Sequence, residues 1–167
     1  MRLSQRPNGF VLAQQRGDAP DDGSTLLPSS AATLPLHLLA TLLLKIGGTA
    51  VLFPPDDPAY MRRLLQGERW TPGVNAKLRM QRGAPSQCHR NTALWWEANA
   101  PTHGPRVAMV TGYALTPDDG LWREHTWGLW LRPRAGTTII ETTVARTAYF
   151  GLVLTPEDAE LFVYANE

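Results

Sequence analysis

Residues Ser86–Trp96 read SQCHRNTALWW and contain the single cysteine of the chain, Cys88. The break Gly83-Ala84-Pro85 comes directly before this stretch and favours the start of a helix after it. Ser86 is then the expected N-cap, which puts Cys88 at about the second helical position. A thiol in the first turn of a helix has a lowered pKa, because unpaired N–H groups and the helix dipole favour its thiolate. A free cysteine is more often a small buried apolar residue, so this stretch alone does not identify a nucleophile.

The residues around this stretch predict an α+β fold. Helices come first, and we expect them at 30–46 and 58–65, with a short strand between them at 49–53. The second half has β-rich runs separated by turn residues, and we expect strands at 106–115, 125–131, 137–143 and 149–154. A short extended segment at 77–80 and a short final helix from about residue 156 complete the prediction. This order predicts N-terminal helices packed on a C-terminal antiparallel β-meander, because helices and strands do not alternate.

The domain organisation follows from composition. Residues 1–30 are interrupted by glycine, proline and aspartate, so we expect a flexible or loosely packed N-terminal arm with at most one short strand at 10–12. Residues 31–167 are expected to form a single α+β domain of catalytic type. The chain of 167 residues is long enough for one domain with a real core.

Charge and hydropathy exclude several classes of protein. The net charge is +1, which gives no bulk electrostatic case for binding nucleic acid or an acidic membrane. One cysteine excludes an internal disulfide and fits a reducing compartment. The most apolar run, 34–46, is shorter than the roughly 20 residues of a membrane span, and residues 1–16 lack the apolar core of a secretory signal. We therefore expect a soluble cytoplasmic protein that needs no cofactor.

The stretch 125–131, HTWGLWL, begins with a histidine on an otherwise apolar strand face. In an extended strand His125, Trp127 and Leu129 point the same way. A histidine in such surroundings needs polar partners. A thiolate on one side of the ring and a carboxylate on the other would satisfy both nitrogens and fix one tautomer. We therefore take His125 as the general base for Cys88.

Glu141, within TTIIETT, is the candidate for that carboxylate. A turn at 132–136 would place Leu131 opposite Thr137. That register leaves His125 one diagonal step from Glu141, within side-chain reach. A slip of one residue would turn Glu141 towards solvent, and a solvated strand glutamate is the alternative interpretation.

A cysteine at a helix start, a histidine opening a strand and an acid in the adjacent strand form an arrangement that resembles the papain-like and transglutaminase-like superfamily of cysteine enzymes. The resemblance covers about residues 84–154 and is carried by the Cys88 helix with its Trp95 and Trp96, by HTWGLWL and by TTIIETT. It implies the roles of nucleophile, general base and orienting residue for Cys88, His125 and Glu141. The third residue is more often Asn or Asp in that superfamily, so Glu141 is a departure from the pattern.

Further residues are candidates for supporting roles. An oxyanion hole would use the Cys88 backbone N–H and a side-chain amide from Gln81 or Gln87; of the two, Gln81 is closer to the spacing found in papain-type enzymes. Asn91 could contribute to this support or brace the start of the helix. Trp122 follows a turn and is the candidate for stacking a substrate at the rim of the site.

Together these residues predict a cysteine-dependent acyl-transfer enzyme. The expected reaction is hydrolysis of an amide, peptide or thioester bond, or transfer of the acyl group to an amine, with a peptide, protein or small amide or thioester as substrate. One alternative is a non-catalytic binding or accessory protein, of phage or bacterial type, that keeps the fold.

A zinc site is the weaker alternative. Cys88, His89, His103 and His125 are soft or borderline ligands, but they lack the spacing of known zinc motifs. His89 also remains a rival base, although it is expected to face away from Cys88 along the helix. Basic residues are frequent between positions 62 and 90, and such a region is usually a solvated face. If it is functional, it indicates an acidic partner or substrate.

Overall fold

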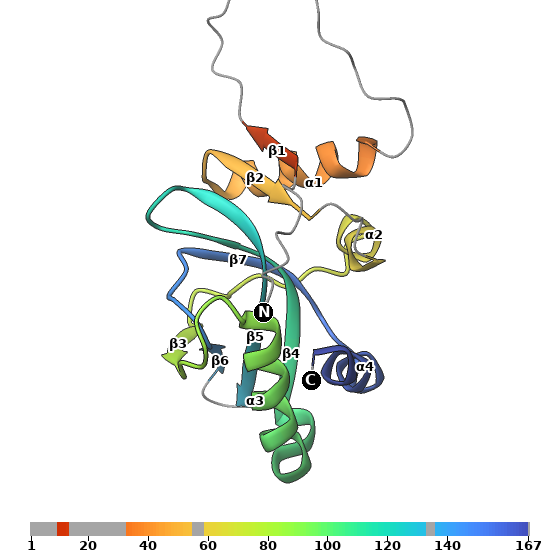
Figure 1. Ribbon diagram of the computed structural model, residues 1–167, viewed down its shortest axis with the longest axis vertical. Helices are drawn as coiled ribbons and strands as arrows, with labels where there is room; N and C mark the ends of the chain where they lie inside the picture. The colour runs from red at the N-terminus through yellow and green to blue at the C-terminus, as the bar shows by residue number, and fades with distance from the viewer. Residues whose placement is uncertain (1–9, 14–32, 55–58, 133–135, 167) are drawn as a thin grey trace, which may run out of the picture.

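The computed structural model describes residues 10–13, 33–54, 59–132 and 136–166 (Figure 1). Within these residues the fold is mixed α+β, with seven strands in one sheet. The strands are β1 (Phe10–Ala13), β2 (Ala50–Phe53), β3 (Lys77–Met80), β4 (Val107–Leu115), β5 (Leu121–Arg132), β6 (Gly136–Glu141) and β7 (Ala148–Val153). The helices are α1 (Thr33–Ile46), α2 (Ala59–Leu65), α3 (Cys88–His103) and α4 (Pro156–Asn166), with a 3₁₀ turn, η1 (Gly104–Arg106), after α3.

The long strand β5 organises the sheet. One edge of β5 pairs antiparallel with β4 from Trp122 to Trp130. Its other edge is shared by two strands: β2 pairs in parallel with residues 121–123, and β6 pairs antiparallel with residues 128–132. Among the described strands, none pairs with residues 124–127 on this second edge. The sheet therefore forks along β5. Between the two branches, one edge of β5 has no strand partner among the described residues, and another element can occupy the space beside it.

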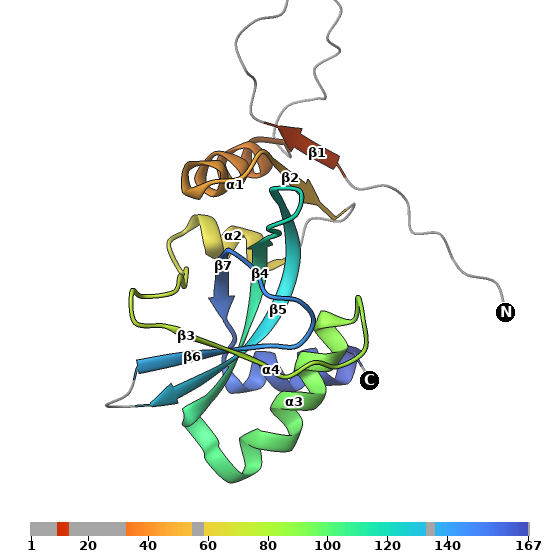
Figure 2. The same ribbon diagram turned by 90° about the vertical axis from the view of Figure 1, so that its left-hand side faces the viewer.

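The helices lie at two ends of the sheet (Figures 1 and 2). Helix α1 lies against β2 near the end where β1 and β2 pair, and α2 packs beside β4 and β7. Helix α3 packs across β4 and β5 at the other end, with α4 beside it. The chain thus returns α3 to the part of β5 where the sheet forks.

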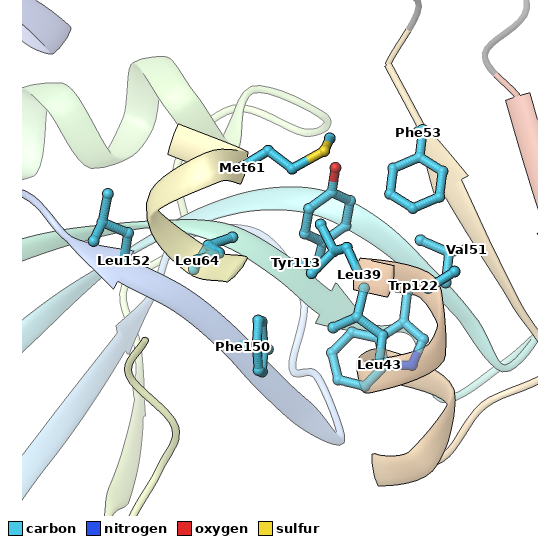
Figure 3. Close-up of a cluster of buried hydrophobic side chains, with 11 residues drawn as sticks. Leu39, Leu43, Val51, Phe53, Met61, Leu64, Tyr113, Trp122, Phe150 and Leu152 are labelled. Carbon is cyan, nitrogen blue, oxygen red and sulfur yellow. The ribbon is translucent and has the colours of Figure 1, made fainter. Parts of the chain in front are cut away.

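Trp122 lies in the hydrophobic core and not at a substrate rim. Figure 3 shows its side chain in a buried cluster with residues of α1, α2, β2, β4 and β7. It is 0% exposed, and its indole N–H donates to the Gly47 carbonyl at 2.8 Å. The prediction of Trp122 as a stacking residue is wrong, because strand alternation turns this position towards the helix-covered face.

The predicted elements are largely present, but their pairing differs from a simple meander. Strands β4, β5 and β6 do form an antiparallel meander, whereas β7 pairs with β4 on the far edge. Strands β2 and β3 come from the N-terminal half and join the sheet by parallel pairing with β5 and β6. Strand β5 begins at Leu121, so His125 lies inside the strand and does not open it.

The N-terminal prediction is tested only in part. The predicted short strand is present as β1, paired antiparallel with β2, while the remainder of the predicted arm at 1–30 lies outside the described residues. None of the helices in the described ranges combines the length and apolar character that crossing a bilayer requires.

A close approach of two backbones joins β4 to β7. Gly112 stands opposite Gly151 in the antiparallel register. A Cβ at position 112 would lie 2.3 Å from the carbonyl oxygen of Phe150 and 2.4 Å from the Cα of Gly151. Both of these atoms belong to the backbone, so they cannot move aside as a flexible side chain would. Gly112 is therefore a position where only glycine lets the two backbones approach this closely.

Substitution Gly112→Ala should therefore lower the free energy of unfolding by about 1–3 kcal/mol or more, as overpacking of a tight site does. Urea unfolding followed by tryptophan fluorescence measures the change. Gly73→Ala is the matched control, because a Cβ there meets nothing within 4 Å. Equal stability of the two variants would contradict this account of the β4–β7 contact.

Candidate functional site

Cys88 is the first residue of α3. The N-cap is Gln87, whose side chain makes no capping hydrogen bond. The predicted N-cap, Ser86, precedes it in the left-handed region with φ 57°, a conformation that favours glycine. The position of Cys88 in the first helical turn is as expected, but Ser86 acts as a sharp turn before the helix and not as its cap.

The segment before α3 is hydrogen-bonded to the strand that carries Glu141. Strand β3 pairs in parallel with β6, and this register places Met80 beside Glu141. The pairing continues beyond β3, because the Gln81 N–H donates to the Glu141 carbonyl at 2.8 Å and the Gly83 N–H donates to the Thr142 carbonyl at 2.9 Å. The residues that lead to Cys88 are therefore positioned by the same strand as the acid.

Asn91 braces the start of α3, one of the two roles expected for it. Its side-chain amide donates to the Ala84 carbonyl at 2.7 Å, and its Oδ1 accepts from the Ala84 N–H at 3.0 Å. The Asn91 side chain fills the space beside Gly83, where an added Cβ would lie 2.4 Å from its Cγ. Asn91 is thus a support for the loop and does not face the Cys88 thiol as an oxyanion donor.

Helix α3 begins beside residues 124–127 of β5, which pair with β4 on one edge and with no described strand on the other. The Thr92 hydroxyl donates to the Thr126 carbonyl at 3.1 Å, and it contacts the Thr142 hydroxyl at 3.3 Å. The backbone of Thr126 also hydrogen-bonds to the Cys88 sulfur. The helix start thus takes the place of a strand along this edge, and this is how a helical thiol reaches a histidine inside a strand.

His125 and Glu141 form a buried pair with Nε2–Oε2 2.8 Å. Their side chains are 1% and 0% exposed. The register expected from the sequence is confirmed, because Leu131 pairs with Thr137. Since Nε2 faces Glu141, Nδ1 is the ring nitrogen left for Cys88.

Other donors fix the Glu141 carboxylate. The Tyr149 hydroxyl donates to Oε2 at 3.1 Å, while the backbone N–H and the hydroxyl of Thr143 donate to Oε1 at 2.9 and 3.0 Å. Trp127 stacks against the His125 ring at 6.0 Å between centroids. A buried carboxylate is stable only when hydrogen bonds and an opposite charge compensate its lost hydration, and these groups provide both.

The pKa values of the cluster shift in opposite directions. Burial acts to raise the pKa of Cys88, but hydrogen bonding and charge from His125, with backbone N–H groups, lower it overall. Burial acts to lower the pKa of His125, but its contacts with Cys88 and Glu141 raise it. Burial acts to raise the pKa of Glu141, whereas His125 and Thr143 lower it. All three directions favour a thiolate, an imidazolium and a carboxylate together.

Cys88 and His125 line a cleft of about 550 Å³. Arg82, Arg123 and Arg146 also line it. The side chains of Gln81 and Gln87 are exposed and are not part of its lining. The structure therefore brings together Cys88, His125 and Glu141, and it does not bring the predicted oxyanion glutamines into the cleft.

The rival base and the zinc alternative find no support in this geometry. His89 packs edge-on against Phe162 of α4, and His103 lies 4.7 Å from Trp130 between ring centroids. In the part of the chain that is described, no three His, Cys, Asp or Glu side chains gather as a metal site would require. His125 is the histidine whose side chain contacts Cys88.

Sequence reasoning missed Tyr149, Thr143 and the cleft arginines. Tyr149 stood at the start of the last predicted strand, but its proximity to Glu141 depends on β7 pairing with β4, which the local sequence does not reveal. Thr143 carries a usable signal, because a threonine two residues after a buried acid can cap its carboxylate.

Comparisons with known proteins identify no relative. No family model, no curated protein and no solved structure matches the chain.

The paired pKa shifts predict the pH dependence of Cys88 alkylation by iodoacetamide. In the native protein the rate should stay high below pH 9.0, the ordinary thiol pKa, and should fall only when the pH drops below the lowered pKa of Cys88. In His125→Ala, burial acts without its compensation, so the midpoint should move above that of the native protein. Mass spectrometry of quenched time points, taken over about pH 5–10, measures both profiles. Coincident profiles would refute the pairing.

Substitution Glu141→Gln should lower the pKa of His125, because it removes an opposite charge at hydrogen-bond distance. Titration of the His125 ring by NMR measures this change. Glu97→Gln is the matched control, since Glu97 is exposed on α3. An unchanged His125 titration in Glu141→Gln would contradict the buried pair.

Proposed function

We propose that this protein is a cysteine-dependent acyl-transfer enzyme that hydrolyses an amide, peptide or thioester bond. Cys88 is the nucleophile, His125 the general base and Glu141 the orienting acid. One observation carries the proposal: a thiol at a helix start lines a cleft beside a histidine whose far nitrogen is bonded to a buried carboxylate. A nucleophile, a base and a third group that orients the base are what this chemistry requires.

In the first step the Cys88 sulfur attacks the substrate carbonyl carbon, and an S–C bond forms as the carbonyl electrons move to oxygen. When the carbonyl re-forms, the bond to the leaving amine or thiol breaks. The proton held at His125 Nδ1 goes to that leaving group. The product is a thioester on Cys88, with a neutral imidazole beside it.

In the second step water attacks the thioester carbonyl and gives a proton to His125 Nδ1. The C–S bond then breaks, the carboxylic acid leaves, and the thiolate and imidazolium are restored. An amine in place of water would give acyl transfer by the same sequence. Glu141 stays ionised throughout, and it keeps its hydrogen bond to Nε2 while the charge on the His125 ring changes.

The developing oxyanion is assigned to the backbone N–H groups at the start of α3. The first N–H groups of a helix lack partners within the helix and point along its positive end. The backbone N–H of His89 already lowers the pKa of the Cys88 thiol by hydrogen bonding. The Cys88 N–H is the expected donor, and the exposed Gln81 and Gln87 are not needed for it.

Membership of the papain-like and transglutaminase-like superfamily is part of this proposal. It is supported by the chain order of a cysteine at a helix start, a histidine in an antiparallel strand and an acid in the next strand. It is also supported by the use of Nε2 for the acid, which leaves Nδ1 for the thiol. The reduced thiol that this chemistry needs fits the cytoplasm.

The alternative of a non-catalytic accessory protein would be favoured by a Cys88 side chain directed away from His125. Cys88 instead contacts His125 and lines the cleft. The cost of burying Glu141 is also more easily explained by a working site than by a surface for binding. These observations support the enzyme over the accessory protein.

The test is to trap the acyl-enzyme. The protein is incubated with a panel of peptide amides and acyl thioesters, quenched in acid and measured by intact mass spectrometry, with an electrophilic thiol probe in parallel. We expect an acyl adduct on Cys88 and a loss of turnover of about 10³-fold or more in His125→Ala.

Cys88→Ala shows whether the adduct is on the cysteine. Undiminished probe labelling of Cys88 in both His125→Ala and Glu141→Ala would refute the assigned base. The absence of any adduct and of any enhanced probe reactivity would favour the accessory protein.

A further inference from the structure

Arginines from three separate segments meet at the cleft of Cys88. Arg82 lies in the segment before α3, Arg123 lies on β5, and Arg146 follows β6. Arg123 is two residues from His125 and shares its strand face. The planar guanidinium group is the side chain best suited to bind a carboxylate through two parallel hydrogen bonds.

Arg123 and Arg146 are held side by side by Thr116. The Thr116 hydroxyl accepts from both side chains, at 2.9 Å from Arg123 and 2.7 Å from Arg146. Asp119 binds Arg123 with both carboxylate oxygens, at 2.9 and 2.6 Å, and this contact lowers the pKa of Asp119 to about 2. Asp119 therefore compensates Arg123, and the adjacent positive charge of Arg146 remains.

Arg146 has an unsatisfied donor. Its Nε is buried, and no acceptor among the described residues bonds to it. Within the same part of the chain, no carboxylate pairs with Arg146 or with Arg82. Because Nε is buried, a ligand in the cleft would meet the remainder of the Arg146 guanidinium, whose charge no carboxylate of the described residues neutralises.

The other charged groups near the cleft form no ion pair with Arg82 or Arg146 among the described residues. Glu124 lines the cleft but accepts the Tyr60 hydroxyl at 2.8 Å. Glu141 is buried and bonded to His125. The Cys88 thiol contacts the His125 ring, and the largest effects that lower the pKa of Cys88 come from that ring. Arg82 and Arg146 are the cleft cations that remain for a ligand.

We infer that Arg82 and Arg146 bind a carboxylate of the substrate beside the carbonyl that Cys88 attacks. The inference rests on the proposed acyl-transfer function and narrows its substrate to acyl compounds that carry a carboxylate close to the cleaved bond. Arg123, fixed by Asp119, positions Arg146 through Thr116. The carboxylate would belong to an acidic side chain or to the end of a peptide.

Two alkylating reagents of nearly equal size test the inference. Iodoacetate carries a carboxylate where iodoacetamide carries a neutral amide, and both react with the same sulfur. The quantity measured is the alkylation rate with iodoacetate divided by the rate with iodoacetamide, determined by mass spectrometry at low salt. This ratio should be higher at Cys88 than at free cysteine. It should fall about three- to tenfold in Arg82→Gln and in Arg146→Gln, as expected when one positive charge near the site is lost.

The charge-matched control is Arg62→Gln, because Arg62 is exposed on α2 and does not line the cleft. Arg82 is exposed, so its variant remains informative if Arg146→Gln folds poorly. An unchanged ratio in both variants would overturn the inference. An equal slowing of both reagents would also overturn it, because the arginines would then only stabilise the thiolate.

This experiment separates the inference from the proposed function. If Cys88 reacts with iodoacetamide no faster than free cysteine does at about pH 6, the proposed function fails. If iodoacetamide reacts rapidly but the ratio does not depend on Arg82 or Arg146, only the carboxylate site fails.

Protection of Cys88 from iodoacetamide distinguishes the two sources of the carboxylate. N-acetylglutamine offers a terminal carboxylate, N-acetylglutamic acid α-amide offers a side-chain carboxylate, and N-acetylglutaminamide offers neither. We expect one of the two acids to protect Cys88, with the protection lost in Arg146→Gln. Equal protection by the neutral compound, or none by either acid, would count against a carboxylate site.

Discussion

The site depends on the edge of β5 at residues 124–127 that faces away from β4, because no described strand pairs with it. A strand edge left open inside a sheet must be satisfied by some other group, because its backbone polar atoms are strong hydrogen-bonding groups. Here β2 ends its pairing at Arg123 and β6 begins at Gly128, and the start of α3 fills the space between them through Thr92 and Thr126. Cys88 is thus placed by a requirement of the sheet, and His125 is the residue next to that contact.

The buried Glu141 carboxylate sets a second requirement. It has to keep hydrogen bonds from three chain segments, supplied by His125, Thr143 and Tyr149. This fixes the register of β6 against β5 and the position of β7 at the same time. A charge of this kind gives little net stability, because desolvation offsets the attraction. Its contribution is to hold one arrangement of the imidazole. Arg146 lies in the connection that follows β6 and lines the cleft.

Much of this site could be predicted from local sequence. Alternation on HTWGLWL placed His125 on the same face as Trp127, and the turn length gave the register that brings Glu141 to it. Asn91 as a brace for the helix start also followed from spacing. The parts that were not predicted depend on contacts between distant segments: the burial of Trp122 beneath α1, the β7–β4 pairing that brings Tyr149 to Glu141, and the Thr116 hydroxyl that joins Arg123 to Arg146. A single sequence carries no periodic signal for such contacts, and strand order is decided by packing.

The parallel pairing of β3 with β6 has a consequence for biosynthesis. The segment leading to Cys88 is ordered by strand residues that follow it in the chain, and Thr92 meets Thr142 across a separation of 50 residues. A ribosome therefore releases the thiol long before its partners exist. Contacts of such long range cost loop-closure entropy before they form, so we expect the nascent Cys88 to have the pKa of an ordinary thiol until β6 joins the sheet. The surroundings that lower the pKa of Cys88 are therefore complete only when the sheet is nearly complete.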